Sequence, residues 1–147
     1  MKEKFVVIVE DNRGDEELTT RALQGSGICH RLVVLRDGAQ ALDYFLGREN
    51  ERPRPLPDLI LLDLKIPKVG GLEVLKRLRA DERTRLLPVV VLSSSTKPED
   101  VIGAYRSGCN SYLNKEIDFS EFMEATKVLA QYWLTLNVVT VEEARVL

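Results

Sequence analysis

The chain has 147 residues, of which 44% are hydrophobic and 30% are charged, and its net charge is −2. This length suits one domain with a sizeable core, and the composition excludes a disordered chain, a collagen-like repeat and a disulfide scaffold. The near balance of charge argues against a nucleic-acid-binding domain, which needs a clustered basic face. The apolar runs are too short to span a membrane, and the N-terminus lacks the apolar stretch of a signal peptide. We therefore expect a cytoplasmic protein with no nucleic-acid or membrane partner.

Short β-prone runs alternate along the chain with stretches of helical periodicity. A charged, proline-broken insertion at 48–55 interrupts this alternation and is typical of a surface loop. In chain order we expect a strand at 5–9, a helix around 18–23, a strand at 31–35, a helix around 41–46, a strand at 58–63, a helix opening at 70–71, a strand at 89–92, a helix at 98–107, a strand at 111–114 and a helix at 119–136.

The third expected strand, 58–63, is apolar without alternation, so both of its faces should be buried. Strict alternation of strands and helices implies right-handed crossovers and a parallel sheet covered on both sides. Five strands in such a fold commonly take the order 2-1-3-4-5, with a ligand crevice between strands 1 and 3. The sequence thus predicts a flavodoxin-like, doubly wound α/β fold with a five-stranded parallel sheet and five helices.

Carboxylate, hydroxyl and amine side chains, which can take part in catalysis or binding, lie where four of these strands end. Glu10 and Asp11 follow the first strand, Asp63 ends the third, Ser93 follows the fourth and Lys115 follows the fifth. Each residue alone has an ordinary explanation as a cap, a turn residue or a surface charge. Their joint occurrence at four strand ends instead predicts one site at the carboxyl edge of the sheet.

Three crowded carboxylates repel one another unless a cation neutralises them, and Mg²⁺ is the hard, oxygen-preferring ion that suits them. An added lysine and hydroxyl can hold a phosphoryl group by charge and hydrogen bonds. An aspartate carboxylate can itself attack phosphorus to give an aspartyl-phosphate. The predicted chemistry is therefore phosphoryl transfer to a carboxylate.

Four segments resemble the receiver domains of two-component response regulators over about residues 4–135. The segments are VVIVEDN, LILLDLKIPKVGGLEVL, PVVVLSSS and SYLNK. The second of them, with Asp63, Pro67 and Gly71 in register, is the most specific. The resemblance implies that Asp63 is the phosphoacceptor. It also implies that Glu10 and Asp11 bind Mg²⁺ together with Asp63 and the backbone carbonyl of Lys65.

The same resemblance implies roles in switching. Ser93 corresponds to the hydroxyl that turns toward the phosphoryl group, and Tyr112 to the aromatic residue that changes rotamer. Lys115 corresponds to the lysine that pairs with the phosphoryl group, and the backbone N–H of Ser94 would lie beside its oxygens. These changes would reshape the face made by the fourth helix, the fifth strand and the fifth helix.

The residue after Lys115 departs from the receiver pattern, in which a proline follows the lysine through a cis peptide bond. Here the residue is Glu116. A cis bond before a non-proline residue costs about 2.5–4 kcal/mol, so this bond is either strained or trans. The Glu116 carboxylate could also compete with a phosphoryl group for Lys115.

The insertion and the aromatic end of the last helix, 132–134, give a narrower resemblance to regulators paired with bacteriophytochrome histidine kinases. The expected partner is thus a sensor histidine kinase, although regulators of other kinases share the insertion. We expect residues 1–136 to form the receiver domain. The remainder, 137–147, is β-prone and ends apolar, which favours a dimerisation arm in a homodimer. The alternative is an extension folded back on its own domain.

The leading hypothesis is a stand-alone response regulator that is not an enzyme, apart from catalysing phosphoryl transfer to its own Asp63. A pseudo-receiver that binds proteins without phosphorylation, a phosphotransfer relay and a phosphate sink are the alternatives. A phosphatase or hydrolase is disfavoured, because such enzymes usually carry a second carboxylate two residues after the nucleophile, where this chain has Lys65.

Overall fold

A computed structural model of the protein describes residues 3–28, 30–47 and 54–138. Most of the proline-broken insertion and most of the C-terminal extension lie outside these ranges. The elements are β1 Lys4–Val9, α1 Arg13–Gly25, β2 His30–Leu35, α2 Gly38–Leu46, β3 Leu59–Leu62, α3 Gly71–Ala80, β4 Val89–Ser93, α4 Pro98–Ser107, β5 Ser111–Asn114 and α5 Phe119–Gln131, followed by the π-helical turn η1 Tyr132–Leu136.

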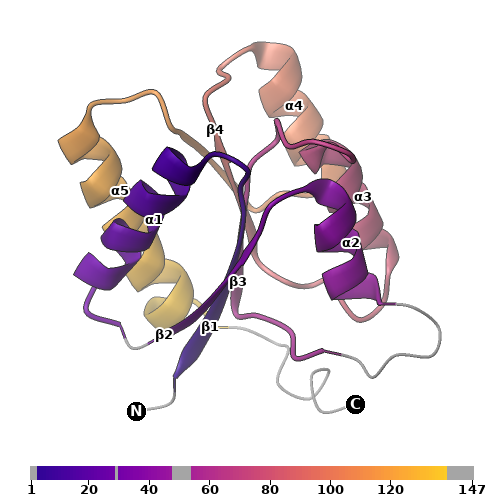
Figure 1. The fold of residues 1–147 in the computed structure, drawn as a ribbon, viewed down its shortest axis with the longest axis horizontal. Helices are drawn as coiled ribbons and strands as arrows, with labels where there is room; N and C mark the ends of the chain where they lie inside the picture. The colour runs from indigo at the N-terminus through magenta and orange to yellow at the C-terminus, as the bar shows by residue number, and fades with distance from the viewer. Residues whose placement is uncertain (1–2, 29, 48–53, 139–147) are drawn as a thin grey trace.

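The five strands form one parallel sheet in the order β2-β1-β3-β4-β5, which confirms the predicted topology. Helices α1 and α5 cover one face of the sheet, and α2, α3 and α4 cover the other (Figure 1). Because all five strands run the same way, their carboxyl ends meet at one edge. None of the described helices is long and apolar enough to cross a membrane.

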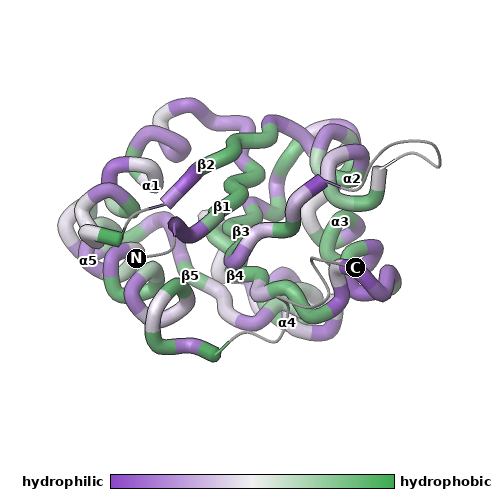
Figure 2. The backbone as a smooth tube through the Cα atoms, turned by 90° about the horizontal axis from the view of Figure 1, so that it is seen from below, coloured by the Kyte–Doolittle hydropathy of each residue, from purple (hydrophilic) through white to green (hydrophobic). Residues whose placement is uncertain are grey.

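The central strands are buried on both faces. Every residue of β3 and β4 is buried, and alternate residues along each strand belong to one of two hydrophobic clusters, one under each helical layer. Figure 2 shows the hydrophobic colour concentrated along these strands, while the helices around them mix hydrophobic and hydrophilic stretches. This two-sided burial is the physical reason that β3 and β4 read as apolar runs without alternation.

Two glycines let the loop after β3 pack tightly enough to fix Asp63. A Cβ atom added at Gly71 would lie 2.5 Å from the backbone oxygen of Asp63, and one added at Gly38 would lie 1.8 Å from that of Val69. The N–H of Gly71 donates to the Leu64 carbonyl at 3.0 Å. Only glycine permits these approaches. The loop is therefore held between the end of β3 and the start of α2.

The last helix differs from its prediction. The α-helix ends at Gln131 and continues as the π-helical turn, rather than running unbroken to Leu136. Phe122, Thr126, Ala130 and Leu134 are its buried residues, and Leu129 and Trp133 are partly buried against the core, whereas Phe119 is 59% exposed. Thr126 and Ala130 are too polar or too small to stand out in a hydrophobic pattern, so that pattern alone does not mark the whole buried face.

Candidate phosphoryl-transfer site

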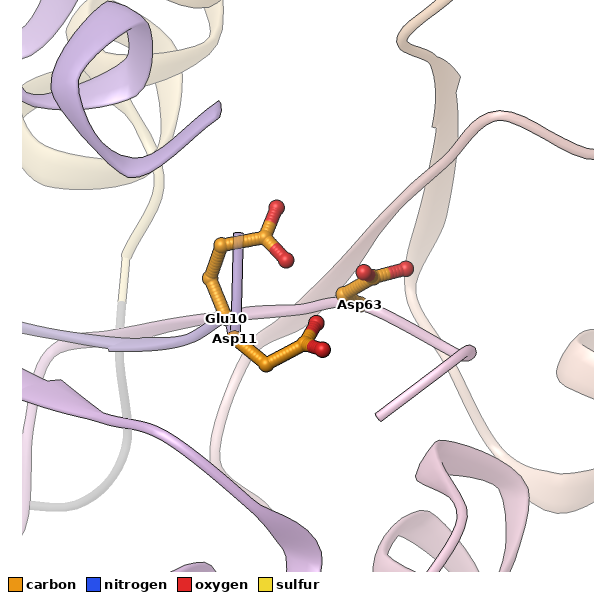
Figure 3. A group of neighbouring side chains, drawn as sticks. All are labelled: Glu10, Asp11 and Asp63. Carbon is orange, nitrogen blue, oxygen red and sulfur yellow. The ribbon is translucent and has the colours of Figure 1, made fainter. Parts of the chain in front are cut away.

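Three carboxylates meet at the carboxyl edge of the sheet. Glu10 follows β1 and Asp63 follows β3, and these strands are neighbours in which Val9 pairs with Leu62. One oxygen from each of Glu10, Asp11 and Asp63 lies within 4.8 Å of the others. Figure 3 shows the three carboxylates gathered at the strand ends. Glu10 and Asp63 are buried and Asp11 is exposed, so the cluster is open to solvent on the Asp11 side.

The electrostatics of this cluster fit a bound divalent cation. The pKa of Glu10 is raised to about 7, first by burial and then by its hydrogen bond with Asp63, while Lys115 acts in the opposite direction. The three carboxylates of the cluster have one lysine, Lys115, among them, so negative charge exceeds positive charge. The donors are oxygen atoms, which Mg²⁺ and similar hard ions prefer. The donor set and its charge are thus those of a magnesium-type site.

Lys115 extends its ammonium group into the same cluster. Its backbone N–H donates to the Ser93 carbonyl at 2.8 Å, and its side chain is only 8% exposed. The Nζ atom lies 2.7 Å from Glu10 Oε1, 2.8 Å from Asp15 Oδ2 and 3.3 Å from Asp63 Oδ2. Burial alone would lower the pKa of Lys115, but hydrogen bonds to Asp15 and Glu10 outweigh it and raise the pKa above its ordinary value. Lys115 is therefore a permanently charged donor.

Sequence reasoning missed Asp15. This residue lies in the first turn of α1, and its backbone N–H donates at 2.9 Å to the side chain of Asn12, the N-cap residue. The prediction considered only residues at strand ends, whereas Asp15 is five positions beyond Glu10. The available signal was a carboxylate placed about one helical turn after the acidic pair.

Ser93 and Tyr112 both contact the loop between β4 and α4. Ser93 is fully buried, and its Oγ accepts a hydrogen bond from the Ser95 N–H at 3.1 Å. The Tyr112 hydroxyl donates to the Ser95 carbonyl at 2.6 Å, and the half-buried ring packs against the core. The Ser95 hydroxyl in turn donates to Asp100 on α4. Ser94, between the two contacts, is exposed.

Lys65 and Glu116 are close in sequence to residues of the cluster, Lys65 two positions after Asp63 and Glu116 directly after Lys115. The backbone N–H of Lys65 donates to Asp63 Oδ1 at 3.3 Å. Among the described residues no peptide bond is cis, so the Lys115–Glu116 bond is trans. Glu116 is exposed, and its N–H donates to Asn114 Oδ1 at 2.9 Å. Within the described ranges it forms no ion pair with Lys115. The carboxylate outside the predicted site that holds Lys115 is Asp15, which corrects the expectation for Glu116.

Residues 6–127 match the family model of the response regulator receiver domain. The chain is 42% identical over 133 residues to the probable methanogenesis regulatory protein FilR2 of Methanothrix harundinacea, covering 90% of this chain and 85% of that protein. It is 35% identical over 131 residues to the response regulator Rcp1 of Synechocystis, covering 89% of each chain.

Solved structures agree with these relatives. The phosphorylated cyanobacterial phytochrome response regulator RcpA superposes with a TM-score of 0.87 at 35% identity, covering 94% of this chain and 99% of RcpA. The Mn²⁺-bound form of Rcp1 superposes with a TM-score of 0.85 at 34% identity, covering 93% and 99% of the two chains.

Proposed function

Because the chain belongs to the receiver-domain family of response regulators, we propose that it accepts a phosphoryl group from a sensor histidine kinase onto Asp63, with Mg²⁺ bound beside it. The resemblance to phytochrome-linked regulators is also confirmed, since RcpA is such a regulator. The observation that carries the proposal is the meeting of Asp63 with Glu10, Asp11 and Lys115 at one edge of the sheet, where Lys115 Nζ lies 3.3 Å from Asp63 Oδ2.

In the proposed step, a carboxylate oxygen of Asp63 forms a bond to phosphorus while the bond from phosphorus to the kinase histidine breaks. The imidazole nitrogen keeps the electron pair of that bond, and Asp63 becomes an acyl phosphate. The Lys115 ammonium and the Ser94 N–H would then face the phosphoryl oxygens. Both donors belong to segments that directly follow neighbouring strands, so little reorganisation is needed when the charge arrives.

Glu10, Asp11, Asp63 and the Lys65 carbonyl would hold the metal ion. When bound, Mg²⁺ supplies positive charge that offsets the carboxylates and the incoming phosphoryl oxygens. The raised pKa of Glu10 and the short distances between the carboxylates support this assignment. The Mn²⁺-bound state of Rcp1 supports divalent-ion binding by a related chain.

The output of the proposed reaction is a change in the face made by α4, β5 and α5. Turning the Ser93 hydroxyl so that it donates to a phosphoryl oxygen would carry its Oγ away from the Ser95 N–H, which now donates to it at 3.1 Å. Since Ser95 also accepts the Tyr112 hydroxyl and donates to Asp100, loss of the Ser93 contact would loosen the start of α4 and the Tyr112 ring together. Exposed Ile102 and Tyr105 on α4 are apolar groups that such a shift would reposition.

Two protein interactions are proposed. The first is with a sensor histidine kinase of the phytochrome type, which the similarity to RcpA supports.

The second is the formation of a homodimer through the extension 137–147, which follows the receiver domain of residues 1–136. Residues 139–147 lie outside the described residues. Support comes from the exposed apolar side chains that lead into the extension, Leu136 and Val138.

Incubation with acetyl phosphate tests the central step. Intact mass should show the gain of one phosphoryl group in the presence of Mg²⁺, and no gain with a chelator. Asp63→Asn should abolish the gain, whereas Asp81→Asn, at the far end of α3, should not. A folded parent protein that never gains the group would overturn the proposal and favour a pseudo-receiver.

A light-scattering measurement tests the dimer. The full chain should have the mass of two copies, and a chain truncated after Leu136 should have the mass of one. A dimer that survives the truncation would show that the extension is not the interface.

A further inference from the structure

Asp15 is the one carboxylate on Lys115 that the proposed chemistry does not use. It is on α1 rather than at a strand end, and its side chain is 38% exposed, compared with 5% for Glu10 and 9% for Asp63. Its position is nevertheless defined, because the Asn12 cap holds its backbone N–H. The 2.8 Å contact with Lys115 Nζ is therefore a built feature of the first turn of α1.

All three N–H donors of the Lys115 ammonium have a protein carboxylate as acceptor. The contacts to Glu10 and Asp15 are shorter than the 3.3 Å contact to Asp63, so the ammonium lies nearer to these two carboxylates than to the proposed phosphoacceptor. A phosphoryl group on Asp63 needs at least one of these donors. Glu10 is buried directly after β1, so its carboxylate cannot exchange Lys115 for water, whereas the Asp15 side chain is partly exposed and can be hydrated. Asp15 is thus the partner that can release Lys115.

We propose that Asp15 is a positioning residue that draws Lys115 away from Asp63 and so weakens the hold on a phosphoryl group at the site. This inference rests on the proposed phosphorylation of Asp63. Its consequence is a lower equilibrium level of phosphorylation and a shorter phosphoryl lifetime than the same site would have without the Asp15 charge. Asp15 therefore regulates the duration of the signal from within the chain.

The test compares Asp15→Asn with the parent protein in full-length form. Two quantities are measured at saturating Mg²⁺: the affinity for beryllofluoride, a phosphoryl mimic, and the rate at which phosphorylated Asp63 loses its phosphoryl group by intact mass. We expect beryllofluoride to bind about threefold to tenfold more tightly and the loss to slow by a similar factor, as one charge-assisted hydrogen bond is weakened. Asp15→Glu, which keeps the charge, should stay near the parent.

Two controls separate positioning from a general loss of negative charge. Glu17→Gln removes one charge from the same helix, where Glu17 pairs with Arg21 at 2.6 Å, and should change both quantities less than twofold. In a Lys115→Met background, Asp15→Asn should no longer slow the loss of the phosphoryl group. An equal effect of Asp15→Asn with and without Lys115 would overturn the proposal, as would a parent-like Asp15→Asn that melts at the parent temperature.

Failure of the proposed function gives a different result. If the parent protein binds no beryllofluoride and gains no phosphoryl group, the assignment of Asp63 falls and the inference falls with it. If the parent does both and Asp15→Asn changes neither, only the role of Asp15 is overturned.

Discussion

Two cationic side chains lie at opposite edges of the sheet and are held in different ways. At the carboxyl edge, the acceptors of the Lys115 ammonium among the described residues are three carboxylates. At the amino edge, Arg79 donates from Nε to the Gly108 carbonyl at 2.8 Å and from one terminal nitrogen to the Leu87 carbonyl at 2.7 Å. Its other terminal nitrogen donates to Asn110 Oδ1 at 2.9 Å. One cation is held by charge and the other by neutral, fixed acceptors.

Because of this difference, the hydrogen-bond partners of Lys115 can be exchanged for a new ligand, whereas those of Arg79 are fixed. The carbonyls around Arg79 belong to the loops that precede β4 and β5, so their positions are set by the sheet. Burial lowers the pKa of Arg79, and no carboxylate is among the hydrogen-bond partners found for it in the described chain. Around Lys115 negative charge is in excess, and a new ligand can exchange places with an existing one. The neutral acceptors make Arg79 and its partners Leu87, Gly108 and Asn110 a structural clamp, and the carboxylates make the surroundings of Lys115 a site that can respond to a ligand.

The largest expected effect is on the clamp. Arg79→Met should leave several backbone carbonyls without a donor and lower the free energy of unfolding by about 3 kcal/mol, since each unsatisfied buried group costs about 1–3 kcal/mol. Urea unfolding measures this change. Arg77→Met, on the exposed side of the same helix, is the matched control and should change stability by less than about 0.5 kcal/mol. A parent-like Arg79→Met would mean that the carbonyls find water instead.

A smaller effect is expected from pH at the carboxyl edge. Without metal, the pKa of Glu10 is about 7 in the folded chain against 4.5 ordinarily, so the folded state binds more protons than the unfolded state between these values. Stability therefore falls as pH rises through this window. From pH 5 to pH 8, with a chelator present, the parent should lose on the order of 2 kcal/mol more than Glu10→Gln. Urea unfolding at several pH values measures the difference.

Two outcomes would contradict this pH dependence. Parallel curves for the parent and Glu10→Gln would show that Glu10 is not the titrating group. A parent that gains stability over the same range would show that the Lys115 contact dominates the pKa of Glu10 instead. Added Mg²⁺ should stabilise the parent more at pH 8 than at pH 5, because it needs the ionised carboxylate.

The sheet and most of the site were predictable because they depend on strand patterns and strand ends. Two-sided burial makes β3 and β4 continuous apolar runs, and parallel order then brings Glu10, Asp63 and Lys115 to one edge. Helix α4 and strand β5 have the bounds that were predicted, since a proline starts that helix and Gly108, in the left-handed conformation, ends it.

The features that were missed depend on how elements pack rather than on their own patterns. Asp15 reaches Lys115 at 2.8 Å although the two residues are 100 positions apart, so the contact depends on where the fold places the first turn of α1. The buried face of α5 depends on Thr126 and Ala130, whose small side chains pack against the rest of the layer without a hydrophobic signal. The sequence left open whether the bond before Glu116 is cis or trans, and among the described residues it is trans.

The smallest expected effect comes from giving Arg79 the kind of partner that Lys115 has. Asn110 Oδ1 accepts from both Arg79 and the Val89 N–H, at 2.9 and 2.8 Å, and the Asn110 residue is exposed. Asn110→Asp keeps this oxygen and adds a charge, so it should change the free energy of unfolding by less than about 1 kcal/mol at neutral pH. Asn110→Ala removes the acceptor and should cost about 1–2 kcal/mol. A large stabilisation by Asn110→Asp in urea unfolding would mean that Arg79 is short of negative charge, and the contrast between neutral and charged acceptors at the two edges would then not hold.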